Sequence, residues 1–264
     1  MKTYRKPHRV RKKKSIVKNR FFWLTLLILL FLGTFLYFLF FSPFFQIKEI
    51  LISGNEEISA EKVKNIVEKN LEKKILFLST KNIFLVNLNH IKKEILDSFP
   101  PIAETEILKV FPDTLNVIIE ERLAIANLCQ ENNCFLLDGE GIIFEKNFKE
   151  NLIKIADEQT VDRIPTLGEK IIEKDYLDKI FKVQKNISED LKIEIKEFIV
   201  FGEKLNVRTI ENWEIYFDPK GDLSWQLTKL NLVLKEKIPL EKRKDLEYIE
   251  LRFGDFATFR YEKK

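Results

Sequence analysis

The sequence predicts an α+β protein in which a single transmembrane helix is followed by two folded domains. Residues 21–41 form an uninterrupted run without a charged side chain, which predicts the helix. Residues 44–122 show strand and helix patterns in the order strand, helix, helix, strand, strand. Residues 123–264 show mainly hairpin-like strand patterns with flanking helices, which predicts a mainly antiparallel β domain. With a basic tail over residues 1–20, we expect four segments.

The uncharged run is long enough to cross a membrane. At about 1.5 Å rise per residue, a helix over 21–41 spans roughly 30 Å, the thickness of a bilayer's hydrocarbon core. A cleavable signal peptide would have a shorter apolar core of about 7–15 residues and a cleavage site flanked by small residues. Residues 41–45, Phe-Ser-Pro-Phe-Phe, offer no such site. We therefore expect an uncleaved membrane anchor.

Charge predicts the orientation of this anchor. Residues 1–20 hold ten Lys or Arg and no acidic residue, which predicts a cytoplasmic N-terminus and an extracytoplasmic C-terminal part. Without these ten cations the chain has 35 Lys and Arg against 41 Asp and Glu, a net charge of −6, so its basic balance does not indicate nucleic-acid binding. We expect the tail to contact anionic lipid of the bilayer, with nucleic acid or a protein partner as the alternative.

The first domain begins with a β-rich run over 45–52, which stops at the turn signal of residues 53–55. Ser59 is typical of a helix N-cap, and Glu61 follows in the first turn. Apolar residues then recur at helical spacing, which predicts an amphipathic helix. These residues are Val63, Ile66, Val67 and Leu71.

The rest of this domain is predicted as a loop, a helix and two strands. An apolar loop over 75–86 leads to a helix that begins at Asn87 or Asn89 and ends before Pro100. Two strand-like runs follow over 102–110 and 115–119.

In the second domain, strand patterns alternate with turn signals and two helical patterns. We expect strands over 123–128, 134–138, 193–201, 205–210, 213–217, 246–253 and 256–261, a hairpin over 136–144 that folds back at residues 138–141, helices over 175–187 and after a cap near Asp222, and a loop over 148–162. The last two strands are expected to join at a two-residue turn, Gly254-Asp255.

Two cysteines, Cys129 and Cys134, bracket four polar residues at the mouth of a predicted hairpin. Residues on neighbouring strands reach the Cα separation of about 4.4–6.8 Å that a disulfide accepts, and the compartment is not reducing. A disulfide and two free thiols are both compatible with this pattern.

Residues for catalysis are scarce. The two histidines, His8 and His90, are predicted to lie on opposite sides of the membrane, and the sequence has no glycine-rich phosphate loop. No pair of carboxylates is placed across a predicted cleft, as a glycosidase would need. We expect no enzymatic activity, no metal, no cofactor and no small-molecule substrate.

Four stretches of the chain carry a resemblance to a known family. They are Ile50 to Asn55, Lys109 to Arg122, Phe135 to Phe144 and Leu246 to Phe253. Their order resembles the FtsQ/DivIB family of bacterial cell-division proteins, in which a POTRA domain is followed by an FtsQ-type β domain. The resemblance implies that residues 44–122 are the POTRA domain and residues 123–264 the β domain.

The resemblance also implies a function. It indicates a non-enzymatic scaffold of the inner membrane at the division septum, which links early division components to the septal peptidoglycan synthesis complex. The implied partners are FtsB- and FtsL-type proteins and other membrane proteins of the division machinery. The alternative is a membrane-anchored cell-wall enzyme or a POTRA-bearing export subunit.

The last predicted strand is the candidate partner site. If it lies at a sheet edge, its outer backbone groups are free to pair with a partner's strand. The resemblance implies that the FtsB-type segment binds Phe253, Gly254, Asp255, Phe256, Ala257, Thr258 and Phe259. The alternative is that the three phenylalanines only pack in the core or within the hairpin.

Overall fold

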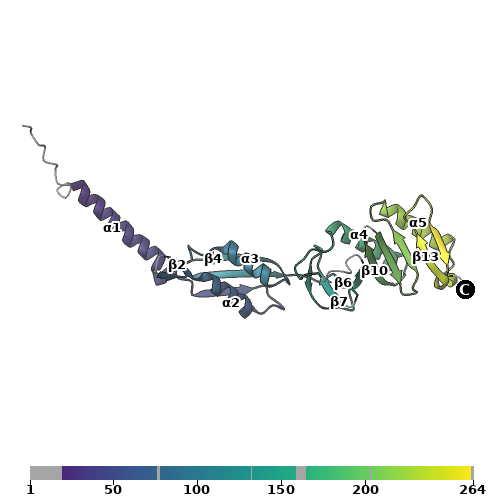
Figure 1. Cartoon of the computed structure of the whole chain (residues 1–264), viewed down its shortest axis with the longest axis horizontal. Helices are drawn as coiled ribbons and strands as arrows, with labels where there is room; N and C mark the ends of the chain where they lie inside the picture. The colour runs from purple at the N-terminus through teal and green to yellow at the C-terminus, as the bar shows by residue number, and fades with distance from the viewer. Residues whose placement is uncertain (1–19, 76–77, 132, 159–164, 203, 263–264) are drawn as a thin grey trace, which may run out of the picture. The chain divides into compact units, whose positions relative to one another are not determined.

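The computed structural model describes residues 20–75, 78–131, 133–158, 165–202 and 204–262 (Figure 1). The chain forms two compact units. Unit 1 comprises the described residues up to Ser53 together with 60–91 and 106–117. Unit 2 comprises 54–59, 92–105 and the described residues from Ile118 onward.

Helix α1 (Arg20–Phe41) contains the predicted span. It is 22 residues long, and none of its residues is buried by the rest of the protein. At about 1.5 Å per residue, its length of roughly 33 Å matches a bilayer's hydrocarbon core. Within the described part of the chain, it is the one helix long and apolar enough to cross a membrane. The helix therefore supports a single-pass membrane anchor.

The first domain has the predicted order of strands and helices. Its elements are β1 (Glu49–Ser53), α2 (Ala60–Leu71), α3 (Leu88–Ser98), β4 (Ile102–Val110) and β5 (Thr114–Glu121). The three strands form one sheet in the order β1-β5-β4. Helix α2 buries its predicted apolar positions Val63, Val67 and Leu71, and α3 buries Ile91 and Ile95.

The turn between β1 and α2 is held against β5. Gly54 has a φ of +82°, and a Cβ there would lie 2.1 Å from the carbonyl oxygen of Ile119, so only glycine fits. Nearby, the Glu121 carboxylate accepts hydrogen bonds at 2.8–3.2 Å from the backbone N–H groups of residues 56–58. Burial opposes ionisation of Glu121, but these N–H groups outweigh it and lower the pKa of the carboxyl.

One part of this domain differs from the prediction. Within and beside the segment predicted as an apolar loop, β2 (Lys73–Ile75) and β3 (Leu78–Thr80) form an antiparallel hairpin. Each strand has three residues, too few for a two-residue alternation to be recognised in the sequence. After the hairpin, Asn87 Oδ1 accepts the N–H of His90 at 3.2 Å, which identifies Asn87 as the cap of α3.

The second domain is one nine-stranded sheet in the order β14-β13-β12-β11-β10-β9-β6-β7-β8. Its strands are β6 (Ala126–Gln130), β7 (Asn133–Leu137), β8 (Ile143–Glu145), β9 (Ile153–Asp157), β10 (Ile195–Phe201), β11 (Lys204–Thr209), β12 (Glu214–Phe217), β13 (Leu246–Glu250) and β14 (Thr258–Tyr261). The pairs β6–β9, β9–β10 and β12–β13 are parallel and the other neighbours are antiparallel. The prediction of an α+β protein with a mainly antiparallel second domain is confirmed.

Two helices cover one face of this sheet. They are α4 (Lys174–Gln184), which continues as a π-helical segment (Lys185–Asp190), and α5 (Leu223–Glu236). Asp222 caps α5 as predicted, because its side chain accepts the N–H of Trp225 at 3.1 Å. Apolar residues of both helices and of alternate strand positions form one core, which includes Leu177, Ile180, Ile215, Phe217, Leu227, Leu230 and Ile249. Short 3₁₀ helices lie at Pro43–Phe45 and Leu240–Asp245.

Strand β9 lies inside the segment 148–162, so the prediction of a loop there is wrong. It pairs in parallel with β6 on one side and with β10 on the other. It has five residues, of which only Ile155 is buried, and two of them are the charged Lys154 and Asp157. So short a segment gives no periodicity that distinguishes it from a loop.

Candidate partner-binding surface

The connection between β13 and β14 is longer than the sequence predicted. The two strands end at Glu250 and begin at Thr258, so residues 251–257 form a loop and the predicted two-residue turn is wrong. The N–H of Leu251 still donates to the carbonyl of Tyr216 in β12 at 3.1 Å, which extends the parallel pairing of β12 with β13 by one hydrogen bond. The loop therefore leaves the sheet only after Leu251.

A buried lysine of α5 holds this loop. The Lys229 ammonium donates to the carbonyl oxygens of Leu251 at 2.8 Å and Gly254 at 2.9 Å, and the residue is 5% exposed. With these two carbonyls fixed from inside, the loop presents Phe253 at 70% exposure and Phe256 at 81%. Large aromatic side chains this exposed are typical of protein interaction sites.

Aromatic and charged side chains lie beside the loop, on the sheet face opposite to the helices. The rings of Tyr216 and Tyr248 stack with centroids 5.4 Å apart. The guanidinium of Arg252 lies 5.0 Å from the ring centroid of Tyr216 and 5.3 Å from that of Phe253. Its Nε also donates to Glu250 at 2.8 Å. Ring stacking, cation–π contacts and an ion pair thus connect β12, β13 and the loop.

The charges of this cluster are fixed at neutral pH. Burial opposes ionisation of Glu250, but the hydrogen bonds and charge of Arg252 outweigh it and lower the pKa of the carboxyl. Burial, together with the nearby carboxylate of Glu214, raises the pKa of Tyr216 to about 12, so its phenol keeps its proton. A partner would therefore meet a neutral hydroxyl next to a closed ion pair.

Strand β14 lies at the edge of the nine-stranded sheet, as the sequence hypothesis requires. Among the described residues it pairs with β13 only, in a register that places Phe259 opposite Ile249 and Thr258 opposite Glu250. Directly after it, the N–H of Glu262 donates to the carbonyl of Asp245 at 2.9 Å. Because N–H groups alternate sides along a strand, we infer that those of Phe259 and Tyr261 point to the open edge.

The seven residues assigned to partner binding fall into two groups. Residues 253–256 lie in the loop and are exposed, whereas Ala257 and Phe259 are half-buried against the core and Thr258 is exposed in β14. The alternative of packing in the core therefore describes Phe259 but not the phenylalanines of the loop.

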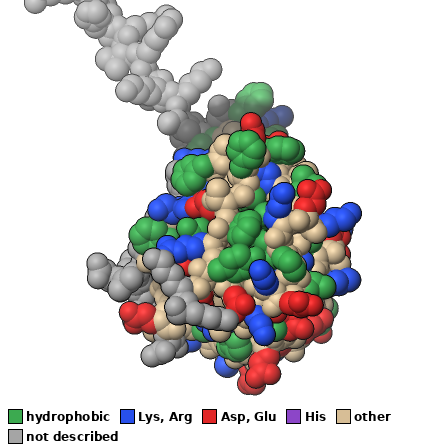
Figure 2. Space-filling model, turned by 90° about the vertical axis from the view of Figure 1, so that its right-hand side faces the viewer, with side chains coloured by type: hydrophobic (Ala, Val, Ile, Leu, Met, Phe, Trp, Pro, Cys, Tyr) green, Lys and Arg blue, Asp and Glu red, His purple; other side chains and the backbone are tan. Residues whose placement is uncertain are grey.

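Figure 2 views the protein from the side on which β13 lies in Figure 1. On this face, exposed hydrophobic side chains lie among acidic and basic ones.

Sequence reasoning missed Tyr216, Tyr248, Lys229 and the Glu250–Arg252 pair. The two tyrosines come from strands joined by parallel pairing, and the helix that carries Lys229 lies between these strands in the chain. Only the alternation of Tyr216 with the buried Ile215 and Phe217 signalled a residue on the opposite face.

Further along the same sheet, a charge network surrounds a buried carboxylate. Glu197 of β10 is 6% exposed and accepts from the Lys154 ammonium at 2.7 Å and the Arg208 guanidinium at 2.5 Å. Burial opposes ionisation, but the two cations outweigh it and lower the pKa of Glu197. Arg208 also binds Glu214 at 2.7 Å. Each charge has an opposite partner, which is typical of a structural network.

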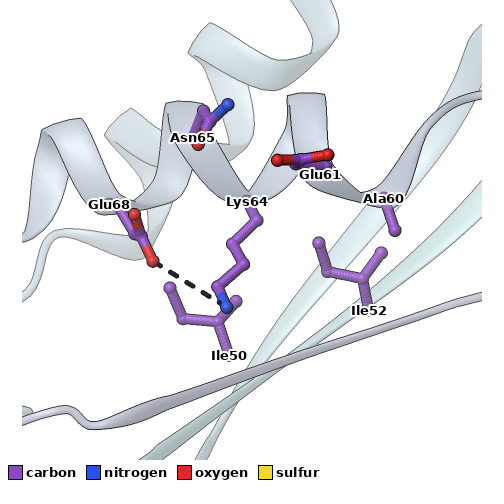
Figure 3. A pocket seen from close by; sticks show the side chains of 7 residues that line it. All are labelled: Ile50, Ile52, Ala60, Glu61, Lys64, Asn65 and Glu68. Carbon is purple, nitrogen blue, oxygen red and sulfur yellow. Dashed lines mark ion pairs between the residues drawn. The ribbon is translucent and has the colours of Figure 1, made fainter.

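A separate hollow of about 530 Å³ lies in unit 1 between α2 and the edge strand β1 (Figure 3). Its lining is mixed, and the one ion pair drawn joins Lys64 to Glu68 at 4.0 Å. The other lining residues are Ile50, Ile52, Ala60, Glu61 and Asn65. Within the described residues no group of three or more His, Cys, Asp or Glu side chains is arranged to hold a metal ion.

The two cysteines lie opposite each other in the β6–β7 hairpin. In the structure their sulfurs are bonded, with the Cα atoms of Cys129 and Cys134 4.1 Å apart. We expect this disulfide to form in the extracytoplasmic compartment, and a thiol count tests it.

Comparison with known proteins gives a consistent set of relatives. Residues 45–122 match the family model described as "POTRA domain, FtsQ-type". The chain is 35% identical over 116 residues to the cell division protein DivIB of Clostridium acetobutylicum, and the aligned region covers 43% of each of the two chains. It is 28% identical to DivIB of Clostridium tetani over 80% of this chain and 77% of that protein.

A third relative, DivIB of Clostridium botulinum, is 23% identical over 84% of both chains. In the first of these matches the aligned region is less than half of the relative's length, whereas the other two matches extend over most of both chains. The order of elements in the first domain, the match to the POTRA model and these three similarities agree with one another. Residues 45–122 are thus an FtsQ-type POTRA domain, and the chain as a whole is similar to the DivIB cell division proteins.

Proposed function

We propose that the chain is a non-enzymatic scaffold of cell division, anchored in the cell membrane at the division septum. It links early division components in the cytoplasm to the septal peptidoglycan synthesis complex, which it recruits or regulates through FtsB- and FtsL-type partners. The observation that carries this proposal is the open edge of β14 beside the aromatic loop 251–257.

The proposed topology rests on charge and on α1. The ten cations of residues 1–20 favour retention of the N-terminus in the cytoplasm. Both folded domains follow the helix and lie on the extracytoplasmic side in this arrangement. The test fuses a reporter that works only in the cytoplasm after Lys264. Activity of this reporter would contradict the proposed topology.

The partner site combines two known means of recognition. An extended segment adds to an open strand edge through backbone hydrogen bonds, and side-chain pockets supply specificity. Phe253 and Phe256 lie in the loop that leads into β14 and offer large apolar contact areas, and Arg252 and the two tyrosines extend the surface along β12 and β13. Aromatic residues and arginine carry much of the binding energy in protein interfaces.

Two carboxylates of this sheet, Glu250 beside the loop and Glu197 in β10, are not poised for general acid catalysis. A general acid needs a pKa raised toward neutrality, whereas Glu250 and Glu197 have lowered pKa values because each is paired with a cation. The lowered pKa values therefore favour structural roles for these two carboxylates over proton transfer.

Two experiments test the proposal. Depletion of the protein should give filamentous, undivided cells, and lysis or an export defect without filaments would instead favour a cell-wall enzyme or an export subunit. In binding assays with the FtsB-type protein of the same organism, Phe256→Ala should weaken affinity about tenfold or more, the loss typical of an interface hot spot. Phe148→Ala, at another exposed phenylalanine, is the matched control. Equal affinities for the two variants would contradict the partner site.

A further inference from the structure

A chain of aromatic rings leads from the membrane helix to the tip of the β4–β5 hairpin. Phe38, on the last turns of α1, contacts Phe45 with ring centroids 6.3 Å apart. Phe45 contacts Phe84 at 5.3 Å, and Phe84 contacts Phe111 at 5.2 Å. Phe44 adds a fifth ring, 5.0 Å from Phe45. All five residues belong to unit 1.

Three of these rings are exposed to a degree unusual for phenylalanine outside a membrane. Phe44, Phe84 and Phe111 are exposed, and so are Val110 and Leu108 on the neighbouring strand β4. Contiguous exposed apolar surface on a folded domain marks an interaction site. We call Phe44, Phe84 and Phe111 the juxtamembrane aromatic surface.

The end of α1 is fixed to the domain that carries this surface. The carbonyl of Phe40 accepts hydrogen bonds from Thr80 at 3.0 Å and Gln46 at 3.3 Å, and that of Leu39 accepts from Asn82 at 2.8 Å. The last carbonyls of a helix have no partner within the helix, so side chains of the domain satisfy them here. Thr80 and Asn82 are buried, which closes the junction to water.

The backbone adds to this attachment. The N–H of Ile83 donates to the carbonyl of Phe45, and the N–H of Ile47 donates to that of Lys81, each at 3.0 Å. In Figure 1 the end of α1 accordingly meets the part of unit 1 labelled β2. The aromatic surface therefore has a set position relative to the end of the helix that spans the membrane.

From this continuity we infer that the juxtamembrane aromatic surface inserts into the interface of the leaflet into which the C-terminal end of α1 emerges. Aromatic side chains gather at membrane interfaces, where their apolar bodies reach the acyl boundary. Lys48 and Lys81, which lie close to these rings in the chain, each form an ion pair, with Asp113 at 2.9 Å and with Glu72 at 3.5 Å. The inference rests on α1 spanning the membrane and not on the proposed partner site.

The test uses the full chain in lipid nanodiscs whose phospholipids carry bromine on the upper part of the acyl chains. Bromine quenches tryptophan fluorescence only at close range, so a tryptophan introduced at Phe111 reports insertion of the surface. Phe111→Trp and Phe84→Trp should each show blue-shifted emission and several-fold stronger quenching than the matched control Phe256→Trp, after subtraction of the signal from Trp23, Trp213 and Trp225.

The control separates this inference from the proposed function, because Phe256 belongs to the partner surface of unit 2. Quenching at Phe111→Trp and Phe84→Trp no stronger than at Phe256→Trp would overturn the inference. It would also be overturned if the two tryptophans were shielded from aqueous acrylamide only after an FtsB-type protein is added, since the surface would then bind protein. Circular dichroism of both variants verifies that they fold.

Discussion

Replacement of Lys229 by methionine tests whether the buried lysine positions the partner-binding loop. The two side chains have similar length and flexibility, but methionine has no hydrogen-bond donor. The substitution therefore removes both hydrogen bonds to the loop, at Leu251 and Gly254, while it keeps most of the packing of α5.

The expected loss of stability follows from the groups left behind. The carbonyl of Leu251 becomes a buried acceptor without a partner, which costs about 1–3 kcal/mol, whereas the carbonyl of Gly254 lies nearer to solvent. Removal of the ammonium ion also removes the penalty of burying a charge, which offsets part of the two charge-assisted hydrogen bonds. We expect a net decrease of about 1–3 kcal/mol in the free energy of unfolding.

The assay is denaturant unfolding of the second domain, followed within the protein, combined with hydrogen exchange of residues 251–257 and affinity for the FtsB-type partner. Lys229→Met should lose stability, exchange faster in the loop and bind the partner more weakly. Lys235→Met, at an exposed lysine of the same helix, is the control and should match the wild type. If the two variants have the same stability and loop exchange, Lys229 does not hold the loop.

A buried carboxylate, a glycine in a turn and a disulfide give three further predictions. Glu197→Gln should destabilise the protein at neutral pH. The pKa of Glu197 in the folded protein lies below its ordinary 4.5, so the carboxylate stabilises the fold above that value and this stabilisation is lost as the pH falls through the folded pKa. The variant should therefore lack this part of the dependence of stability on pH. Gly54→Ala should lower the free energy of unfolding by about 1–3 kcal/mol or more, because alanine is strained at this positive φ and its Cβ clashes with the carbonyl of Ile119. Thiol counting on the denatured, unreduced protein should find no free thiol at Cys129 or Cys134.

Each of these predictions has an outcome that contradicts it. An unchanged slope of stability against pH below 4.5 in Glu197→Gln would mean that the two cations do not stabilise the carboxylate. Wild-type unfolding of Gly54→Ala would mean that the β1–α2 turn moves freely away from β5. Two free thiols in the count would mean that the cysteines remain reduced in the hairpin.

The sequence was sufficient where a local pattern determines the structure. The uncharged run over 21–41 defines α1 because length and polarity alone decide whether a helix crosses a bilayer. The sequence predicts β4 and β5 closely because Pro100, Pro101 and Pro112 delimit them and because buried residues alternate with less buried ones along most of β5. Such patterns belong to a single element and need no information about its neighbours.

The sequence was insufficient where pairing between distant segments determines the structure. Strand β9 is defined by β6 and β10, which lie before and after it in the chain. The pair Gly254-Asp255 favours a tight turn, whereas Lys229 holds the backbone of the loop 251–257 in a wider path through the carbonyls of Leu251 and Gly254. Neither contact leaves a local signal, so the aromatic cluster beside the loop was also missed.

The most direct test of the partner site is replacement of single backbone amides by esters in β14, which removes one N–H and leaves every side chain in place. An ester at Phe259 should lower affinity for the FtsB-type partner with little effect on unfolding, because that N–H points to the open edge. An ester at Arg260 should lower stability instead, because its N–H faces β13. Unchanged affinity with the Phe259 ester in a folded protein would contradict strand addition at this edge.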